Sequence, residues 1–131
     1  MGSTWRRRSV AGTELATGLL MLVGTWVGLP ARWWPVDVPF TLLGVGSVVA
    51  AVGLWRGAAW GVRATRVTLW ALLVAGCTVC TALAWVVAHL FGLYGPVGAG
   101  GALLMGTMAV MILPYLVLLP ALSLRLLAES E

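Results

Sequence analysis

The sequence predicts an all-α integral membrane protein, a bundle of four transmembrane helices joined by short loops. Of the 131 residues, 61% are hydrophobic and only 9% are charged, and the mean hydropathy is +1.02. Such a composition excludes an ordinary soluble domain, a disordered chain and a secreted disulfide scaffold. Four successive apolar runs have the roughly 20-residue length of a bilayer-spanning helix, and nearly all charged residues lie outside those runs.

The first predicted span covers residues 10–29 and the second covers residues 38–55. Three consecutive arginines precede the first span, and Pro30 follows it. Residues 31–37 contain two tryptophans, a proline and two charged residues. This segment is typical of an interfacial loop, because indole rings prefer the headgroup layer and proline ends a helix.

The third predicted span covers residues 67–91 and the fourth covers residues 97–124, with a short turn rich in glycine and proline between them. Pro114 and Pro120 lie inside the fourth span. Each proline removes one intrahelical hydrogen bond, so we expect this span to bend there. The four spans leave no room for a separate soluble domain, and residues 1–131 are predicted to form a single transmembrane domain.

Arginine placement predicts the orientation. Seven arginines fall on one side of the predicted spans and Arg32 alone falls on the other; the seven are Arg6, Arg7, Arg8, Arg56, Arg63, Arg66 and Arg125. The positive-inside rule therefore places both termini in the cytoplasm, in a bacterial-type inner (plasma) membrane. The sequence pI of about 10.1 reflects this orientation, and no nucleic-acid partner is expected. A cleaved signal peptide is the alternative for the first apolar run.

Small residues predict how the helices pack. Helices in a bilayer associate where small residues on one face let two backbones approach closely. The candidate packing residues are Gly24, Gly28, Gly53, Gly57, Gly98, Ala102 and Gly106. They serve either packing within the four-helix bundle or an interface with another chain.

Glu14 is the one ionisable side chain well inside an apolar run. An intramembrane acid is a functional candidate, so Glu14 is a candidate ion-coupling residue. The other interpretation is an interfacial salt bridge with an arginine of the first segment, since Glu14 lies only a few residues past the cytoplasmic boundary. In gross plan the chain resembles small multidrug transporters, which also have four spans and an acid in the first. Their helix lengths and aromatic pattern are not matched here, and no residue is carried over.

Cys77 and Cys80 have the spacing of a thiol redox motif and form a candidate redox pair. Apolar burial near the middle of a span disfavours the reactive thiolate, so packing is the competing interpretation. His89, the only histidine, lies on the opposite helix face from Cys80, which excludes a metal site on one helix. No cofactor or metal is expected. Trp26 is one of three tryptophans whose position would suit a ligand pocket.

These observations predict a non-enzymatic accessory or scaffold subunit that packs through glycine-rich helix faces. The expected partners are the lipid bilayer and either other membrane protein subunits or further copies of the chain. A small oligomeric transporter or channel, with Glu14 as coupling acid, is the first alternative. A membrane thiol oxidoreductase using Cys77 and Cys80 is the second.

Overall fold

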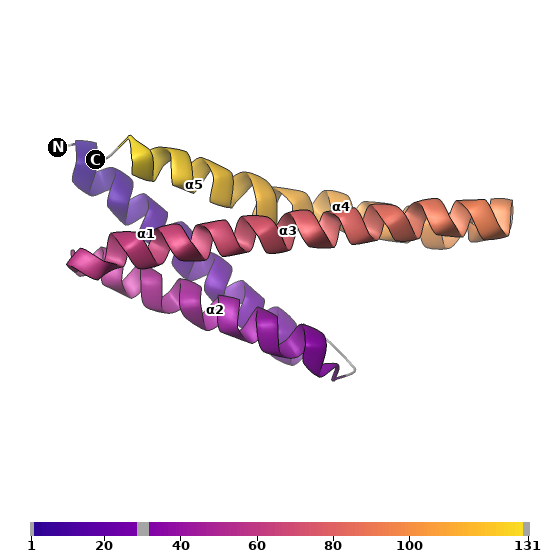
Figure 1. Cartoon of the computed structure of the whole chain (residues 1–131), viewed down its shortest axis with the longest axis horizontal. Helices are drawn as coiled ribbons and strands as arrows, with labels where there is room; N and C mark the ends of the chain where they lie inside the picture. Colours follow the sequence, from indigo (N-terminus) through magenta and orange to yellow (C-terminus); the bar gives the residue numbers. More distant parts are fainter. Residues whose placement is uncertain (1, 29–31, 130–131) are drawn as a thin grey trace. The chain divides into compact units, whose positions relative to one another are not determined.

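The computed structural model describes residues 2–28 and 32–129, and these residues contain helices and no strand (Figure 1). The all-α prediction is confirmed. In chain order the elements are α1 (Gly2–Val23), the π-helical segment η1 (Gly24–Gly28), α2 (Trp34–Trp55), α3 (Ala59–Tyr94), the 3-10 segment η2 (Gly95–Gly98), α4 (Ala99–Leu113), the π-helical segment η3 (Pro114–Leu118) and α5 (Leu119–Ala128).

Three helical stretches in the described part of the chain are long and apolar enough to cross a membrane: Thr4–Gly28, Trp34–Trp55 and Ala59–Ala128. The third stretch contains both the third and the fourth predicted spans. Gly95 interrupts it with a φ of +51°, a backbone conformation that glycine adopts without steric cost. Beyond this residue the chain reverses its direction. Two contacts show the reversal: Gly98 packs against Leu90, and the backbone of Leu116 lies against Gly76. Helices α3 and α4 thus form a hairpin with a short turn, as the sequence predicts (Figure 1).

The helices extend beyond the predicted spans. Helix α1 begins at Gly2, α2 begins at Trp34, and α3 continues past both ends of residues 67–91. Apolar runs mark only the hydrocarbon-facing part of a helix, whereas the helix itself continues because its backbone hydrogen bonds are internal. The 36 residues of α3 correspond to about 54 Å of helix. This length exceeds the about 40–45 Å of a bilayer with its headgroup regions.

The described chain forms two compact units. Unit 1 contains the described parts of residues 1–71 and 121–131, and unit 2 contains residues 72–120. The apolar core of unit 1 draws on α1, α2, the start of α3 and the end of α5, and consists of Val10, Ala11, Leu54, Leu69 and Leu127. Val62 and Leu124 pack against this core.

Helices α1 and α2 make their closest approach at Gly18 and Gly44. A Cβ atom added to Gly18 would lie 2.8 Å from the carbonyl oxygen of Gly44. A Cβ atom added to Gly44 would lie 2.9 Å from the side chain of Leu22 and 3.1 Å from the carbonyl oxygen of Gly18. Only glycine fits at these two positions, because the obstructing atoms include backbone that a rotamer change cannot move.

A tight turn joins α2 to α3. Gly57 has a φ of +68°, and the amides of Ala58 and Gly57 donate to the carbonyl oxygens of Gly53 (3.0 Å) and Leu54 (3.2 Å). This pair of hydrogen bonds is the Schellman arrangement, in which a left-handed glycine follows the helix and satisfies its last carbonyls. Immediately after the turn, Gly61 packs on the backbone of Gly53.

The two prolines of the predicted fourth span occupy different positions. Pro114 opens the π-helical segment η3, and the amide of Leu119 donates to its carbonyl oxygen. A π segment accommodates a residue that has no backbone N–H to donate. Pro120 is buried in the first turn of α5. The helix thus departs from α geometry at Pro114, and the bend of the span stays a prediction.

Unit 2 buries few of its residues. No residue from 77 to 97 is buried, and the sequence from 72 to 120 contains no Asp, Glu, Lys or Arg. All buried polar or charged side chains of the described chain belong instead to unit 1: Glu14, Thr17, Thr25, Ser47, Thr65 and Ser123. The two units therefore differ in chemistry, with an apolar hairpin in one and a partly polar interior in the other.

Candidate functional site

Glu14 is fully enclosed in unit 1, with 2% of its surface exposed. Helix α1 places it on the same face as Val10 and Ala11, which belong to the core, and as Gly18, one turn further on. Both carboxylate oxygens are shielded from solvent and neither accepts a hydrogen bond. Burying a carboxylate in this way is costly, since nothing replaces the water it loses.

The hydroxyl of Ser47 lies on α2, across the helix interface and within reach of the Glu14 carboxyl group. This hydroxyl is also shielded from solvent and also makes no hydrogen bond. Thr65 differs, because its hydroxyl donates to the carbonyl oxygen of Ala50 at 3.4 Å. The sequence analysis does not predict these buried hydroxyls. They could be recognised in the sequence as serine or threonine residues inside an apolar run, on the helix face that carries the small residues.

The interpretation of Glu14 as the partner of an arginine is wrong. Arg6 pairs with Glu129 at 3.0 Å, and Glu14 has no hydrogen-bonding or ionic partner among the residues that the structure describes. The Arg6–Glu129 pair is 41% and 52% exposed, so it contributes little to stability. The pair shows that the start of α1 and Glu129, just after α5, are neighbours in unit 1 (Figure 1).

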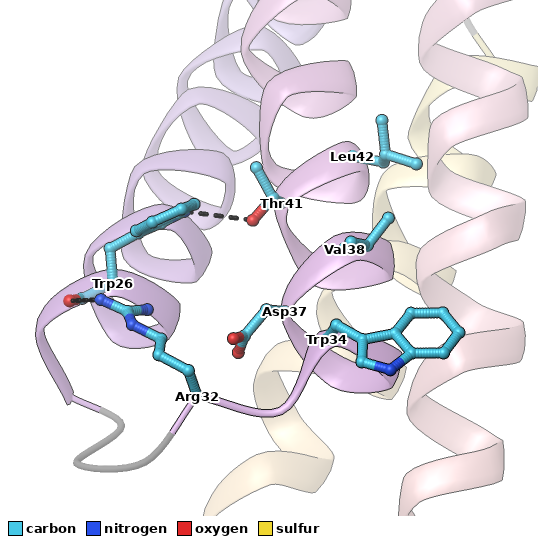
Figure 2. Close-up of a pocket in the computed structure, with 7 residues that line it drawn as sticks. All are labelled: Trp26, Arg32, Trp34, Asp37, Val38, Thr41 and Leu42. Atoms are coloured by element: carbon cyan, nitrogen blue, oxygen red, sulfur yellow. Dashed lines mark hydrogen bonds between the residues drawn. The ribbon is translucent and has the colours of Figure 1, made fainter.

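A pocket of about 380 Å³, hereafter the loop pocket, lies where α1 gives way to α2 (Figure 2). Its lining residues are Trp26, Arg32, Trp34, Asp37, Val38, Thr41 and Leu42. The indole N–H of Trp26 donates to Thr41 Oγ1 at 3.1 Å, which joins η1 to α2. The prediction that Trp26 would suit a ligand pocket agrees with this position.

The Arg32 side chain folds back over η1. Its guanidinium donates to the carbonyl oxygens of Thr25 (3.0 Å) and Trp26 (2.8 Å) and lies 4.6 Å from the centre of the Trp26 ring. These carbonyls belong to η1, where the helix ends and its last oxygens lack intrahelical donors. A cation at this end also interacts favourably with the helix dipole.

Asp37 lies in the first turn of α2 and caps it. Its Oδ2 accepts a hydrogen bond from the backbone amide of Trp33 at 3.1 Å, and a carboxylate there complements the positive end of the helix. Pro35 suits the start of a helix, where its missing N–H costs nothing. The predicted interfacial loop is therefore shorter than residues 31–37, because α2 already begins at Trp34.

The predicted packing residues fall into three groups. Gly53 and Gly98 meet other parts of the chain directly, and Ala102 is buried. Gly57 serves the α2–α3 turn. Gly24, Gly28 and Gly106 have open space where a Cβ atom would be. The last group makes no close approach within the described chain, and its part in packing stays a prediction.

Cys77 and Cys80 are free thiols on α3, Cys77 exposed and Cys80 half-buried. Cys77 borders a shallow surface hollow with Thr81 and Trp85, and His89 borders another. Within residues 2–28 and 32–129, no three His, Cys, Asp or Glu side chains are arranged to hold a metal ion. Whether the two thiols react stays a hypothesis.

No protein-family model matches the chain, and comparison with curated proteins and with solved structures finds no significant match.

Proposed function

We propose that this chain is a four-span integral membrane protein of a bacterial-type inner membrane, with both termini in the cytoplasm. In this proposal it acts as a non-enzymatic accessory or scaffold subunit. The observation that carries the proposal is the hairpin of unit 2, where residues 77–97 are uncharged, largely apolar and without a single buried residue. A surface of this kind suits lipid and other helices, and in water it would drive aggregation.

The arginine distribution supports the orientation. The Arg6–Glu129 pair brings the two ends of the described chain together, which agrees with termini on the same side of the membrane. Arg63 and Arg66 lie in the first turns of α3, close to the α2–α3 turn, which carries Arg56. Arg32 lies between η1 and α2, at the other end of α2 from the turn that carries Arg56. If both termini are cytoplasmic, most of the arginines lie on the cytoplasmic side of the membrane, as the positive-inside rule requires.

The outward glycines support a scaffold role. Gly24 and Gly28 are the first and last residues of η1, four residues apart, and Gly106 lies on α4 one turn after the buried Ala102. Nothing in the described chain lies within 4 Å of a Cβ added at any of the three glycines. Another helix can therefore approach these backbones closely, which is how small residues stabilise helix pairs in lipid.

Substitution of Gly106 tests this proposal. A Cβ atom at Gly106 meets nothing of the described chain within 4 Å, so Gly106→Ala adds a methyl group without a clash inside the chain, and Gly106→Leu adds the bulk that blocks another helix. Gly100→Leu is the matched control, because Gly100 lies on the same helix, is also open and is rotated about 120° away by helix geometry. We expect native mass spectrometry from nanodiscs to show an assembly for the wild type and Gly100→Leu, and its loss for Gly106→Leu. A wild-type chain that remains a lone monomer contradicts the proposal.

A proton-coupled transporter is the second candidate, favoured by the buried Glu14 without a partner. An intramembrane acid of this kind is a typical proton-binding group. The test is proton movement into proteoliposomes under an imposed gradient, followed with an enclosed pH-sensitive dye. Glu14→Gln should abolish the proton movement. Glu129→Gln makes the same chemical change at an exposed acid and should leave the proton movement intact. Equal movement in all three proteins rules this candidate out.

A further inference from the structure

The loop pocket holds two opposite charges that do not pair with each other. Arg32 and Asp37 both line it, and Figure 2 shows their side chains directed toward the same space. Among the residues that the structure describes, no ion pair joins them within 4.0 Å. A guanidinium and a carboxylate that share a pocket without pairing fit a ligand that carries both charges.

The Arg32 guanidinium retains binding capacity. A guanidinium has five N–H donors, and the two hydrogen bonds to Thr25 and Trp26 occupy only part of this set. These bonds and the Trp26 ring fix the group in place. A fixed, planar guanidinium with free donors is suited to binding a phosphate oxygen pair.

The Asp37 carboxylate requires a donor. Its Oδ2 is used by the Trp33 amide, whereas Oδ1 is shielded from solvent and accepts no hydrogen bond. A ligand in the pocket cannot reach Oδ1, but each carboxylate oxygen has two lone pairs, so Oδ2, on a residue that lines the pocket, can accept a ligand N–H besides the Trp33 amide.

We propose that the loop pocket binds the headgroup of a phospholipid that carries a primary amine. The phosphate binds Arg32 and the ammonium group donates to Asp37. A quaternary ammonium has no N–H to donate, and the Trp26 face that would attract it is already covered by Arg32. An anionic headgroup without an amine leaves Asp37 unpaired and facing like charge. This inference rests on the proposed insertion of the chain in a membrane.

The surface next to the pocket suits the acyl chain. Leu42 belongs both to the loop pocket and to a neighbouring groove of about 620 Å³ between α2 and the start of α3. The groove continues along Val45 and Val49 of α2 and meets Val67 of α3. From Val38 to Val49 the helix rises about 16 Å, close to half of the roughly 30 Å hydrocarbon core. One leaflet's chain therefore fits between the pocket and the bilayer midplane.

The test measures which lipids the protein retains. The full chain is reconstituted in nanodiscs that contain equal amounts of phosphatidylethanolamine, phosphatidylcholine and phosphatidylglycerol. It is then released into mild detergent, and the bound lipids are identified by native mass spectrometry. The wild type should retain phosphatidylethanolamine in roughly tenfold excess over either other lipid, the ratio that one charge-assisted hydrogen bond supplies.

Asp37→Asn is the decisive variant, because the amide oxygen preserves the cap on α2 and only the charge is lost. It should remove the preference for phosphatidylethanolamine over phosphatidylcholine. Glu129→Gln, an acid-to-amide change far along the chain, should retain it. Equal retention of all three lipids by the wild type, or an unchanged preference in Asp37→Asn, overturns the lipid site. Failure of the wild type to enter the nanodiscs at all overturns the membrane insertion on which the site rests.

Discussion

Glu14 on α1 and Ser47 on α2 lie across one helix interface, with the Ser47 hydroxyl within reach of the Glu14 carboxyl group but in no well-formed hydrogen bond with it. The interface between them is closed one turn away by Gly18 and Gly44, whose backbones are in contact. The acid is therefore enclosed by packing, with the Ser47 hydroxyl as a polar neighbour and no ion pair among the described residues. This arrangement makes the charge of Glu14 a cost to the fold.

Glu14→Gln should stabilise the protein. Glutamine has nearly the same shape and carries no charge, so the desolvation of a buried carboxylate disappears. We expect a gain of about 1–3 kcal/mol in the free energy of unfolding, measured by titration of mixed micelles with a denaturing detergent. Glu129→Gln, at an exposed position, should change stability by less than about 1 kcal/mol. A loss of stability in Glu14→Gln shows that Glu14 has a stabilising partner.

Gly44→Leu should separate α1 from α2. The new side chain meets Leu22 and the backbone of Gly18, and overpacking of this kind costs about 1–3 kcal/mol or more. Gly12→Leu is the control, since α1 leaves open space there and leucine is a better helix former than glycine. The same unfolding titration checks both variants. Equal stability of the two would contradict the close approach of Gly18 and Gly44.

Gly57→Ala should loosen the α2–α3 turn. The φ of +68° at Gly57 is strained for a residue with a Cβ, at about 1–2 kcal/mol. Gly57→Asn should cost less, because asparagine tolerates the left-handed conformation better than alanine does. We expect unfolding free energies in the order wild type, Asn, Ala. An alanine variant as stable as the wild type would mean that the turn adopts another conformation.

The proposed orientation predicts which turns reach the outside of the cell. In a background with Cys77→Ala and Cys80→Ala, single cysteines at Leu93 and Ala59 probe the two ends of α3, both exposed in the structure. A membrane-impermeant maleimide on intact cells should label Leu93→Cys and leave Ala59→Cys unlabelled until the cells are opened. The reverse pattern would place both termini outside.

The native cysteines provide a related measurement. Cys77 lies well inside the apolar α3, where lipid and not water should surround it. The wild-type chain should therefore resist the same impermeant reagent on intact cells. Rapid labelling from the outside would favour the thiol oxidoreductase hypothesis, because a redox pair requires access to water and to its partner.

The helices and the turn at Gly95 follow from the sequence because apolar runs and helix-breaking residues act locally. The role of Gly57 does not: the sequence analysis predicts a packing residue there, and the structure places it in the α2–α3 turn. Apolar length marks where a helix meets hydrocarbon, and glycine marks where the chain needs a left-handed residue. Helix ends are less predictable, since α1 and α3 continue beyond the apolar residues with no local penalty.

The pairing of distant residues does not follow from the sequence. Gly18 and Gly44 have no feature that sets them apart from Gly24 and Gly28, because only the depth at which two helices cross decides which glycines meet. Glu14 is close to three arginines along the chain, but on α1 it points into the interior. The loop pocket requires the end of α1 and the start of α2 to converge, which neither segment encodes alone.

The mass of the native assembly tests whether the chain acts as a subunit. The chain, with a tag at its C-terminus, is extracted with its surrounding lipid into native nanodiscs, and the intact particle is weighed and its components identified. We expect a stoichiometric complex with another membrane protein or with further copies of the chain, lost in Gly106→Leu and kept in Gly100→Leu. A single monodisperse copy of 13.8 kDa with lipid alone would contradict the proposed role as a subunit.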